Sequence, residues 1–256
     1  MILNVNVYKY ERQNQNMITQ NEFEKIIVEM DTLEGRAPFY RMSTNLYNHG
    51  FKEEAYLLLL STWNFAYFRY IVNAFEINQF REMMDSLEND FKALENCTIE
   101  TANLDEHKDR IVRIFNRLSC EKGSDNQLMI GPTGASKIMH LRLPSFFIMW
   151  DRYISGQEAY KWYETDLIIR CYYEIGTMAN GRWRYKRYTK DGEGYFGFLK
   201  DMKKLFIELS HLHVPKFSDM SMAKHIDTFN YVVITRSIQQ RKKQSSNKRK
   251  RLIRIR

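Results

Sequence analysis

The sequence predicts an all-α fold, an orthogonal array of about eight or nine helices followed by a disordered basic C-terminal tail. Only 11 glycines and 4 prolines interrupt 256 residues, which favours long helices over many short strands. Apolar residues recur three or four positions apart, and strands do not alternate with helices. We expect residues 1–235 to form one all-α globular domain, with two helical subdomains around a central cleft as the alternative.

The first helices are predicted from caps and apolar spacing. Thr19 and Glu22 form a capping box, and apolar residues follow at helical spacing. A short helix is expected over residues 39–47, with Gly50 providing a left-handed C-cap. Residues 51–75 are apolar nearly all round, which predicts one helix at the centre of the bundle.

Periodicity predicts the later helices in the same way. Apolar residues fall on one helical face in five further segments, the third of which opens with a capping box of Ser155 and Glu158. These segments are residues 77–94, 111–118, 155–178, 195–212 and 226–233. A loop at residues 120–127 separates the second segment from a short apolar helix that carries Lys137.

The charge of the chain is concentrated at its C-terminal end. Residues 236–256 contain ten basic side chains and no acid: Arg236, Arg241, Lys242, Lys243, Lys248, Arg249, Lys250, Arg251, Arg254 and Arg256. Removing these ten from the 39 basic residues leaves 29 against 31 acidic residues. Such a tail binds polyanions, whether DNA, RNA or an acidic membrane, or provides a nuclear address in a eukaryote. A solubilising tail is the alternative.

Several classes of protein are disfavoured. Three cysteines without a CxxC motif argue against a disulfide framework and fit a reducing compartment. The N-terminus lacks the pattern of a signal peptide, and the longest apolar run without a charge, residues 55–68, is too short to span a bilayer. The spacing of the histidines does not fit a metal site, so we expect no bound metal. The sequence contains neither a Walker loop nor a GxGxxG motif, so we expect no nucleotide cofactor. We expect an intracellular protein of the cytoplasm or nucleoid, or of the nucleus in a eukaryote.

Residues 130–154, "IGPTGASKIMHLRLPSFFIMWDRYI", combine a glycine-rich turn with two ionisable groups. Gly131 and Gly134 precede a helix whose free amides favour an anion such as phosphate. Lys137 lies about one turn into that helix, where an apolar setting would lower its pKa and make it a plausible nucleophile. Asp151 ends the apolar run and could take a proton or stabilise a cation. The alternatives are a snorkelling lysine and an aspartate that caps a turn.

This arrangement of glycines, lysine, apolar segment and aspartate resembles the helix-hairpin-helix DNA glycosylases. The resemblance implies an all-α protein that binds duplex DNA and excises a base. It implies that Gly131 and Gly134 lie in a hairpin that grips the DNA backbone, that Lys137 attacks the sugar and that Asp151 assists. A non-catalytic nucleic-acid-binding protein and a helical protein-interaction module remain alternatives.

Two further basic segments are candidate DNA contacts. Residues 181–198 interleave cations with aromatic rings, a composition suited to gripping phosphates and stacking on bases. The predicted DNA-binding residues are Arg182, Trp183, Arg184, Lys186 and Arg187 here, and Lys248, Arg249, Lys250 and Arg251 in the tail. A solvated loop or small hairpin is the alternative for the first segment. His140, one turn after Lys137, is expected to be a core histidine with satisfied hydrogen bonds rather than a second polar group in a pocket.

Overall fold

A computed structural model describes residues 19–33, 37–72, 75–151, 154, 178–179, 182–183, 188–209 and 220–236. Within these ranges the protein is all-α, as predicted, with nine α-helices. The helices are α1 (Gln20–Leu33), α2 (Ala37–Asn48), α3 (Lys52–Trp63), α4 (Phe65–Ile71), α5 (Ile77–Lys92), α6 (Lys108–Cys120), α7 (Gly131–Arg142), α9 (Gly192–Leu209) and α10 (Met222–Asn230). Shorter elements are the 3-10 helix η2 (Leu104–His107), the π-helix η5 (Tyr231–Arg236) and the strands β1 (Met178–Ala179) and β2 (Arg182–Trp183).

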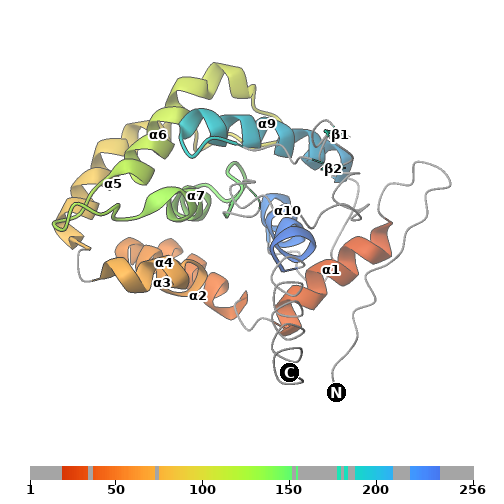
Figure 1. The fold of residues 1–256 in the computed structure, drawn as a ribbon, viewed down its shortest axis with the longest axis horizontal. Helices are drawn as coiled ribbons and strands as arrows, with labels where there is room; N and C mark the ends of the chain where they lie inside the picture. Colours follow the sequence, from red (N-terminus) through yellow and green to blue (C-terminus); the bar gives the residue numbers. More distant parts are fainter. Residues whose placement is uncertain are drawn as a thin grey trace, which may run out of the picture.

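Helix α7 occupies the middle of the array (Figure 1). Helices α2, α3 and α4 lie on one side of it, and α5, α6 and α9 lie on the other. Helix α7 contacts α2, α3 and α6, whereas α10 contacts α1 and α9. One hydrophobic cluster runs through these elements from Phe23 to Ile234. Any group carried by α7 therefore lies near the centre of the described core.

The predicted caps of the first two helices are confirmed. The Glu22 carboxylate accepts a hydrogen bond from the Thr19 backbone N–H at 2.9 Å, and the Glu22 N–H donates to the Thr19 hydroxyl at 3.3 Å. Gly50 has φ +90°, and the N–H of Phe51 closes the helix end on the Leu46 carbonyl at 2.9 Å. This is the bonding pattern of a glycine-capped helix C-terminus.

The single helix predicted for residues 51–75 is wrong, because the chain breaks at Asn64. Asn64 has φ −121° and ψ 21°, outside the helical region, and separates α3 from α4. Its carbonyl accepts from the N–H groups of Tyr67 and Phe68, which starts a new helical turn. Asparagine has a low helix propensity, which favours a break at this position. The sequence pattern did not reveal the break, because apolar residues continue on both sides of Asn64.

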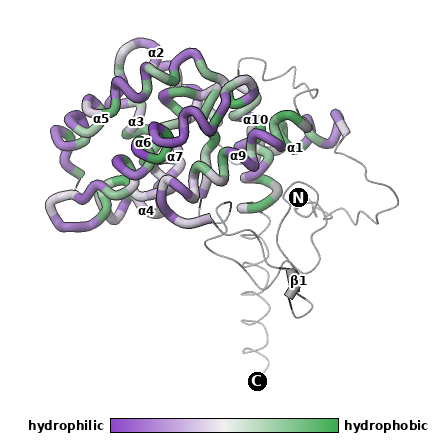
Figure 2. The backbone as a smooth tube through the Cα atoms, turned by 90° about the horizontal axis from the view of Figure 1, so that it is seen from above, coloured by the Kyte–Doolittle hydropathy of each residue, from purple (hydrophilic) through white to green (hydrophobic). Residues whose placement is uncertain are grey.

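The remaining helices follow the predicted spacing. Helices α5, α6, α9 and α10 cover the segments whose apolar residues recur at helical intervals. Helix α5 alternates between hydrophilic and hydrophobic residues along its length, as an amphipathic helix at the edge of a core does (Figure 2). The helix predicted for residues 155–178 lies outside the described residues except for Met178, which begins strand β1. Residues 237–256, the predicted tail, are also outside them, and η5 extends to Arg236, the first residue of that tail.

The apolar run before Asp151 is fixed by aromatic packing between α6 and α9. The rings of Phe115 and Tyr195 stack with their centroids 4.5 Å apart, and the Trp150 ring meets them edge-on at 5.3 and 5.2 Å. Residues 146–150 are at most 2% exposed. Aromatic pairs in such geometries add to the free energy gained by burial. This packing determines where the chain emerges at Asp151.

Gly134 in α7 and Gly197 in α9 should respond in opposite ways to alanine. A Cβ at Gly134 would lie 2.6 Å from Ile130 Cγ2 and 3.1 Å from Leu60 Cδ2, both in the core. A Cβ at Gly197 would meet only the Tyr188 ring at 3.8 Å. We expect Gly134→Ala to lower the free energy of unfolding by about 1–3 kcal/mol. Gly197→Ala should raise it by about 0.5–1 kcal/mol, as alanine normally does in a helix.

Chemical denaturation of the two single variants and the unchanged protein measures both effects. A more stable Gly134→Ala protein would show that α7 does not pack this closely on α3.

Candidate functional site

The two glycines of the candidate site are part of α7 and do not precede it. The sequence placed Gly131 and Gly134 in a turn before the helix, but the helix begins at Gly131. Gly131 has φ +71°, and the direction in which a side chain would project is covered by the Tyr67 ring at 3.5 Å. Gly134 faces Leu60 and Asn64 of the neighbouring segment. The helix starts early because positive φ at glycine turns the chain directly into it, and contact of these glycines with DNA stays a prediction.

Lys137 lies in the interior of the protein. Lys137 is 6% exposed, and its amine donates a hydrogen bond to the backbone carbonyl of Trp63 at the end of α3. A buried ammonium group is costly unless it is hydrogen-bonded or paired, so this position is structurally demanding. The burial agrees with the prediction that the lysine has an apolar setting.

Asp151 lies half-buried at the end of the aromatic segment. One carboxylate oxygen accepts the backbone N–H of Ile154 at 2.9 Å, the hydrogen bond of a capping aspartate. The other accepts the hydroxyl of Thr235 in η5 at 2.7 Å. Asp151 therefore caps a turn and also binds the last described element of the chain.

The segments that carry Lys137 and Asp151 are joined through their neighbours. The Ser136 hydroxyl donates to the Trp150 carbonyl at 3.2 Å and accepts the Trp150 backbone N–H at 3.1 Å. The Trp150 indole N–H donates to the Pro132 carbonyl at 3.1 Å. The start of α7 and the end of the aromatic segment thus lie side by side, while the Lys137 amine binds Trp63 and the Asp151 carboxylate binds Ile154 and Thr235.

A buried ion pair that the sequence analysis missed lies on α10. The Lys224 amine and an Asp227 carboxylate oxygen are 2.5 Å apart, with side chains only 3% and 5% exposed. The amine also lies 4.2 Å from the centroid of the Trp63 ring and 4.8 Å from that of the Tyr40 ring. Cation–π contacts of this kind are strongest where water is excluded.

Trp63 connects this ion pair to the candidate site. Its ring lies under the Lys224 amine, and its carbonyl accepts the hydrogen bond from Lys137. Residues from α2, α3, α7 and α10 thus form one buried polar centre, which we define as Tyr40, Trp63, Lys137, His140, Lys224 and Asp227. A signal was present in the sequence: a lysine and an aspartate lie three positions apart in a segment whose apolar residues follow helical spacing.

His140 is confirmed as a core histidine with satisfied hydrogen bonds. It is 0% exposed, and its Nδ1 lies 2.7 Å from the carbonyl oxygen of Phe147. A carbonyl can only accept, so Nδ1 carries a proton and the Nε2 of the neutral ring accepts from the Tyr40 hydroxyl at 2.9 Å. Burial lowers the pKa of His140 to about 4, with Asp227 opposing the decrease and Lys224 adding to it.

The other predicted DNA contacts are described only in part. Arg182 and Trp183 form strand β2, which pairs antiparallel with β1 through Ala179–Arg182 and Met178–Trp183. Two residues of this segment therefore belong to an antiparallel strand pair. Arg184, Lys186, Arg187, Lys248, Arg249, Lys250 and Arg251 lie outside the described residues.

The described part of the chain contains no group of three or more His, Cys, Asp or Glu side chains placed to hold a metal ion. None of the helices in the described ranges combines the length and apolarity needed to cross a lipid bilayer. Comparison with protein-family models, with curated proteins and with solved structures gave no match for this chain. The proposed function therefore rests on the contacts and charges of the chain itself.

The depressed pKa of His140 predicts a loss of stability in mild acid. The unfolded chain takes up the histidine proton below its ordinary pKa of 6.5, whereas the folded protein takes it up only at about 4. The free energy of unfolding should therefore fall as the pH decreases from 6.5 to 4, by up to about 1.4 kcal/mol per pH unit. Denaturation of His140→Gln, which can keep both hydrogen bonds, should show a shallower fall in this window.

The unchanged protein, measured over the same pH range, is the reference for this comparison. Equal pH slopes for His140→Gln and the unchanged protein would contradict a neutral buried imidazole.

Proposed function

We propose that this protein binds duplex DNA, with the basic residues 236–256 supplying most of the phosphate contacts next to Asp151. The observation that carries the proposal is the hydrogen bond from Thr235 to Asp151. Thr235 is the residue immediately before the basic segment. Ten cations therefore begin beside the candidate carboxylate.

The distribution of charge along the chain favours phosphate contacts by the C-terminal segment. Residues 1–235 have a slight excess of acids, so sequence-independent attraction to phosphates must come mainly from the C-terminal segment. Each neutralised phosphate releases condensed counterions, which makes the affinity steeply dependent on salt. The resemblance of residues 130–154 to the helix-hairpin-helix glycosylases supports DNA as the polyanion.

A second candidate function is base excision with Lys137 as nucleophile and Asp151 as the stabilising carboxylate. The burial of Lys137 favours it, because low-dielectric surroundings favour a neutral, nucleophilic amine. The neutral amine would attack C1′ of a flipped nucleotide, and the base would leave with the bonding electron pair and gain a proton. Loss of a proton from nitrogen and opening of the sugar would give a Schiff base.

Catalysis by Lys137 requires its amine to break the hydrogen bond to the Trp63 carbonyl and to contact the substrate instead. Borohydride would reduce the Schiff base to a stable amine, so covalent trapping on a panel of damaged duplexes distinguishes the two functions. Trapping that disappears in Lys137→Gln and persists in Lys122→Gln supports the enzyme, whereas DNA binding without trapping supports the binder.

Removal of residues 237–256 should weaken DNA binding and flatten its salt dependence. The deletion leaves η5 complete and takes away nine cations, of which each that contacts a phosphate contributes about 0.9 to the slope of log affinity against log salt. Fluorescence anisotropy with a labelled duplex at several salt concentrations measures the slope. A control with the nine cations changed to glutamine keeps the length of the chain and should behave like the deletion.

An unchanged slope in both variants would show that the DNA-binding surface lies elsewhere, and no binding by the full chain would overturn the proposal.

A further inference from the structure

A thiol and an imidazole lie within hydrogen-bonding distance of each other, away from the candidate site. Cys97 follows α5, and His107 ends η2 immediately before α6. The Cys97 Sγ and the His107 Nε2 are 3.6 Å apart. A thiol is a weak donor, and one nitrogen of a neutral imidazole is an acceptor. A nucleophile beside a base is the arrangement that activates a cysteine.

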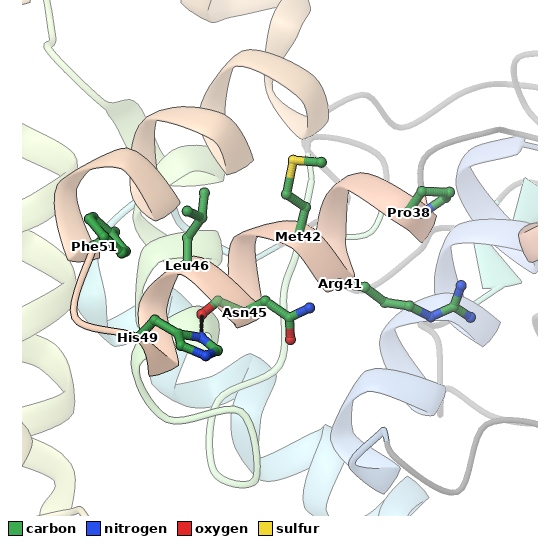
Figure 3. Close-up of a pocket in the computed structure, with 7 residues that line it drawn as sticks. All are labelled: Pro38, Arg41, Met42, Asn45, Leu46, His49 and Phe51. Carbon is green, nitrogen blue, oxygen red and sulfur yellow. Dashed lines mark hydrogen bonds between the residues drawn. The ribbon is translucent and has the colours of Figure 1, made fainter.

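The bonding of His107 differs from that of the structural histidines. Its Nδ1 is buried, and the described part of the chain gives this atom no hydrogen-bond partner. Both nitrogens of His140 are hydrogen-bonded, and the exposed His49 binds the Asn45 carbonyl through Nδ1 at 2.8 Å (Figure 3). Buried polar atoms are rarely left unsatisfied, and a redox or catalytic role is one reason for retaining such an atom. The contact with the thiol is therefore the interaction to explain.

Residues 145–146 hold the thiol and the imidazole together. The N–H of Ile99, two positions after Cys97, donates to the Ser145 carbonyl at 3.0 Å. The His107 ring lies edge-on to the ring of Phe146, with the centroids 6.4 Å apart. The pair is therefore formed before a reagent arrives, which lowers the entropic cost of the reaction.

The imidazole is the base within reach of this thiol among the described residues. The charged side chains of the surrounding loop bind other groups: Glu95 binds Arg142, Asp105 binds Lys200, Glu106 binds Asn103, Lys108 binds Glu193 and Lys203 binds Ala102. Glu100, the other acid between Cys97 and His107, is exposed.

The second described cysteine provides an internal reference. Cys97 is half-buried, with the exposed Asn96 before it, so a small reagent can reach its sulfur. Cys120 is more exposed, but its Sγ lies 3.6 Å from the Ser119 hydroxyl. A hydroxyl does not take up a proton near neutral pH, whereas an imidazole does. Exposure alone would therefore favour reaction at Cys120, and a neighbouring base favours Cys97.

We propose that Cys97 and His107 form a thiol–imidazole pair that makes Cys97 a site of reversible modification by small disulfides. Nε2 of His107 takes the thiol proton, and the thiolate is the nucleophile. When Nε2 accepts from the thiol, Nδ1 already carries a proton, so the transfer leaves no further group unpaired. The site does not depend on the proposed binding of DNA.

The exchange is balanced. The Cys97 sulfur attacks one sulfur of the disulfide, and the S–S bond breaks as the new S–S bond forms. The departing sulfur leaves with the bonding electron pair and gains the proton held by His107. The Cys97 sulfur is oxidised and the departing sulfur is reduced, so one thiol is consumed and one is released.

The rate of modification by bis(2-hydroxyethyl) disulfide tests the proposal. This probe is small and uncharged, and mass spectrometry of peptides from the full chain gives a rate for each cysteine. At pH 7, Cys97 should react faster than Cys120. The rate at Cys97 should rise less than about three-fold from pH 7 to 8, because transfer within the pair leaves the number of bound protons unchanged. A thiol that loses its proton to water gains roughly eight-fold in thiolate over this interval, for an ordinary pKa of about 8.5.

The variant His107→Gln removes the base and keeps a polar side chain. It should lower the rate at Cys97 at pH 7 by roughly ten-fold or more, the least that general-base catalysis normally contributes. The rise from pH 7 to 8 should become steeper at Cys97, and the rate at Cys120 should stay the same. His49→Gln is the matched control, because its imidazole binds a carbonyl and not the thiol, and it should keep the Cys97 rate.

Three results would each overturn the proposal: slower modification of Cys97 than of Cys120, a rise of about eight-fold at Cys97 from pH 7 to 8, or an unchanged Cys97 rate in His107→Gln. The first two are measured on the unchanged protein, so they hold even if the variant does not fold. A His107→Gln protein in which both cysteines react faster has lost its structure, and the pH dependence of the unchanged protein then decides.

Discussion

The buried ion pair between Lys224 and Asp227 is the interaction on which the arrangement of this protein depends most. Two charges that are 3% and 5% exposed must be compensated, and here they face each other at 2.5 Å with the rings of Trp63 and Tyr40 beside the amine. An isolated charge at this depth would be strongly unfavourable. Helix α10 can therefore occupy only a position in which Lys224 reaches both rings, and this ties α10 to α2 and α3.

The same constraint extends to the candidate site. Trp63 also accepts a hydrogen bond from Lys137, and the chain that leaves α10 continues through η5 to Thr235, which binds Asp151. The position of α10 thus determines where the basic segment begins relative to the aspartate. In the proposed function, a structural ion pair places the phosphate-binding cations next to Asp151.

The sequence predicted most of the helices because their apolar residues and caps are local signals, as at Thr19 and Gly50. It did not predict the break at Asn64, since the residues on both sides keep one apolar pattern. Burial of Lys137 followed from its apolar neighbours, but its carbonyl partner on α3 depends on tertiary packing. The same holds for Lys224 and Asp227: their spacing is visible in the sequence, whereas the rings that compensate the charge come from residues far away in the chain.

A double-mutant cycle on Lys224 and Asp227 tests the central claim most directly. Chemical denaturation would give the free energies of unfolding of Lys224→Met, Asp227→Leu and the protein with both changes. We predict that each single change costs roughly 3–5 kcal/mol, because it leaves the other charge buried and unpaired. Both changes together should cost far less than the two added. Small losses that simply add would contradict the account, because they would show that the two charges do not hold α10 in place.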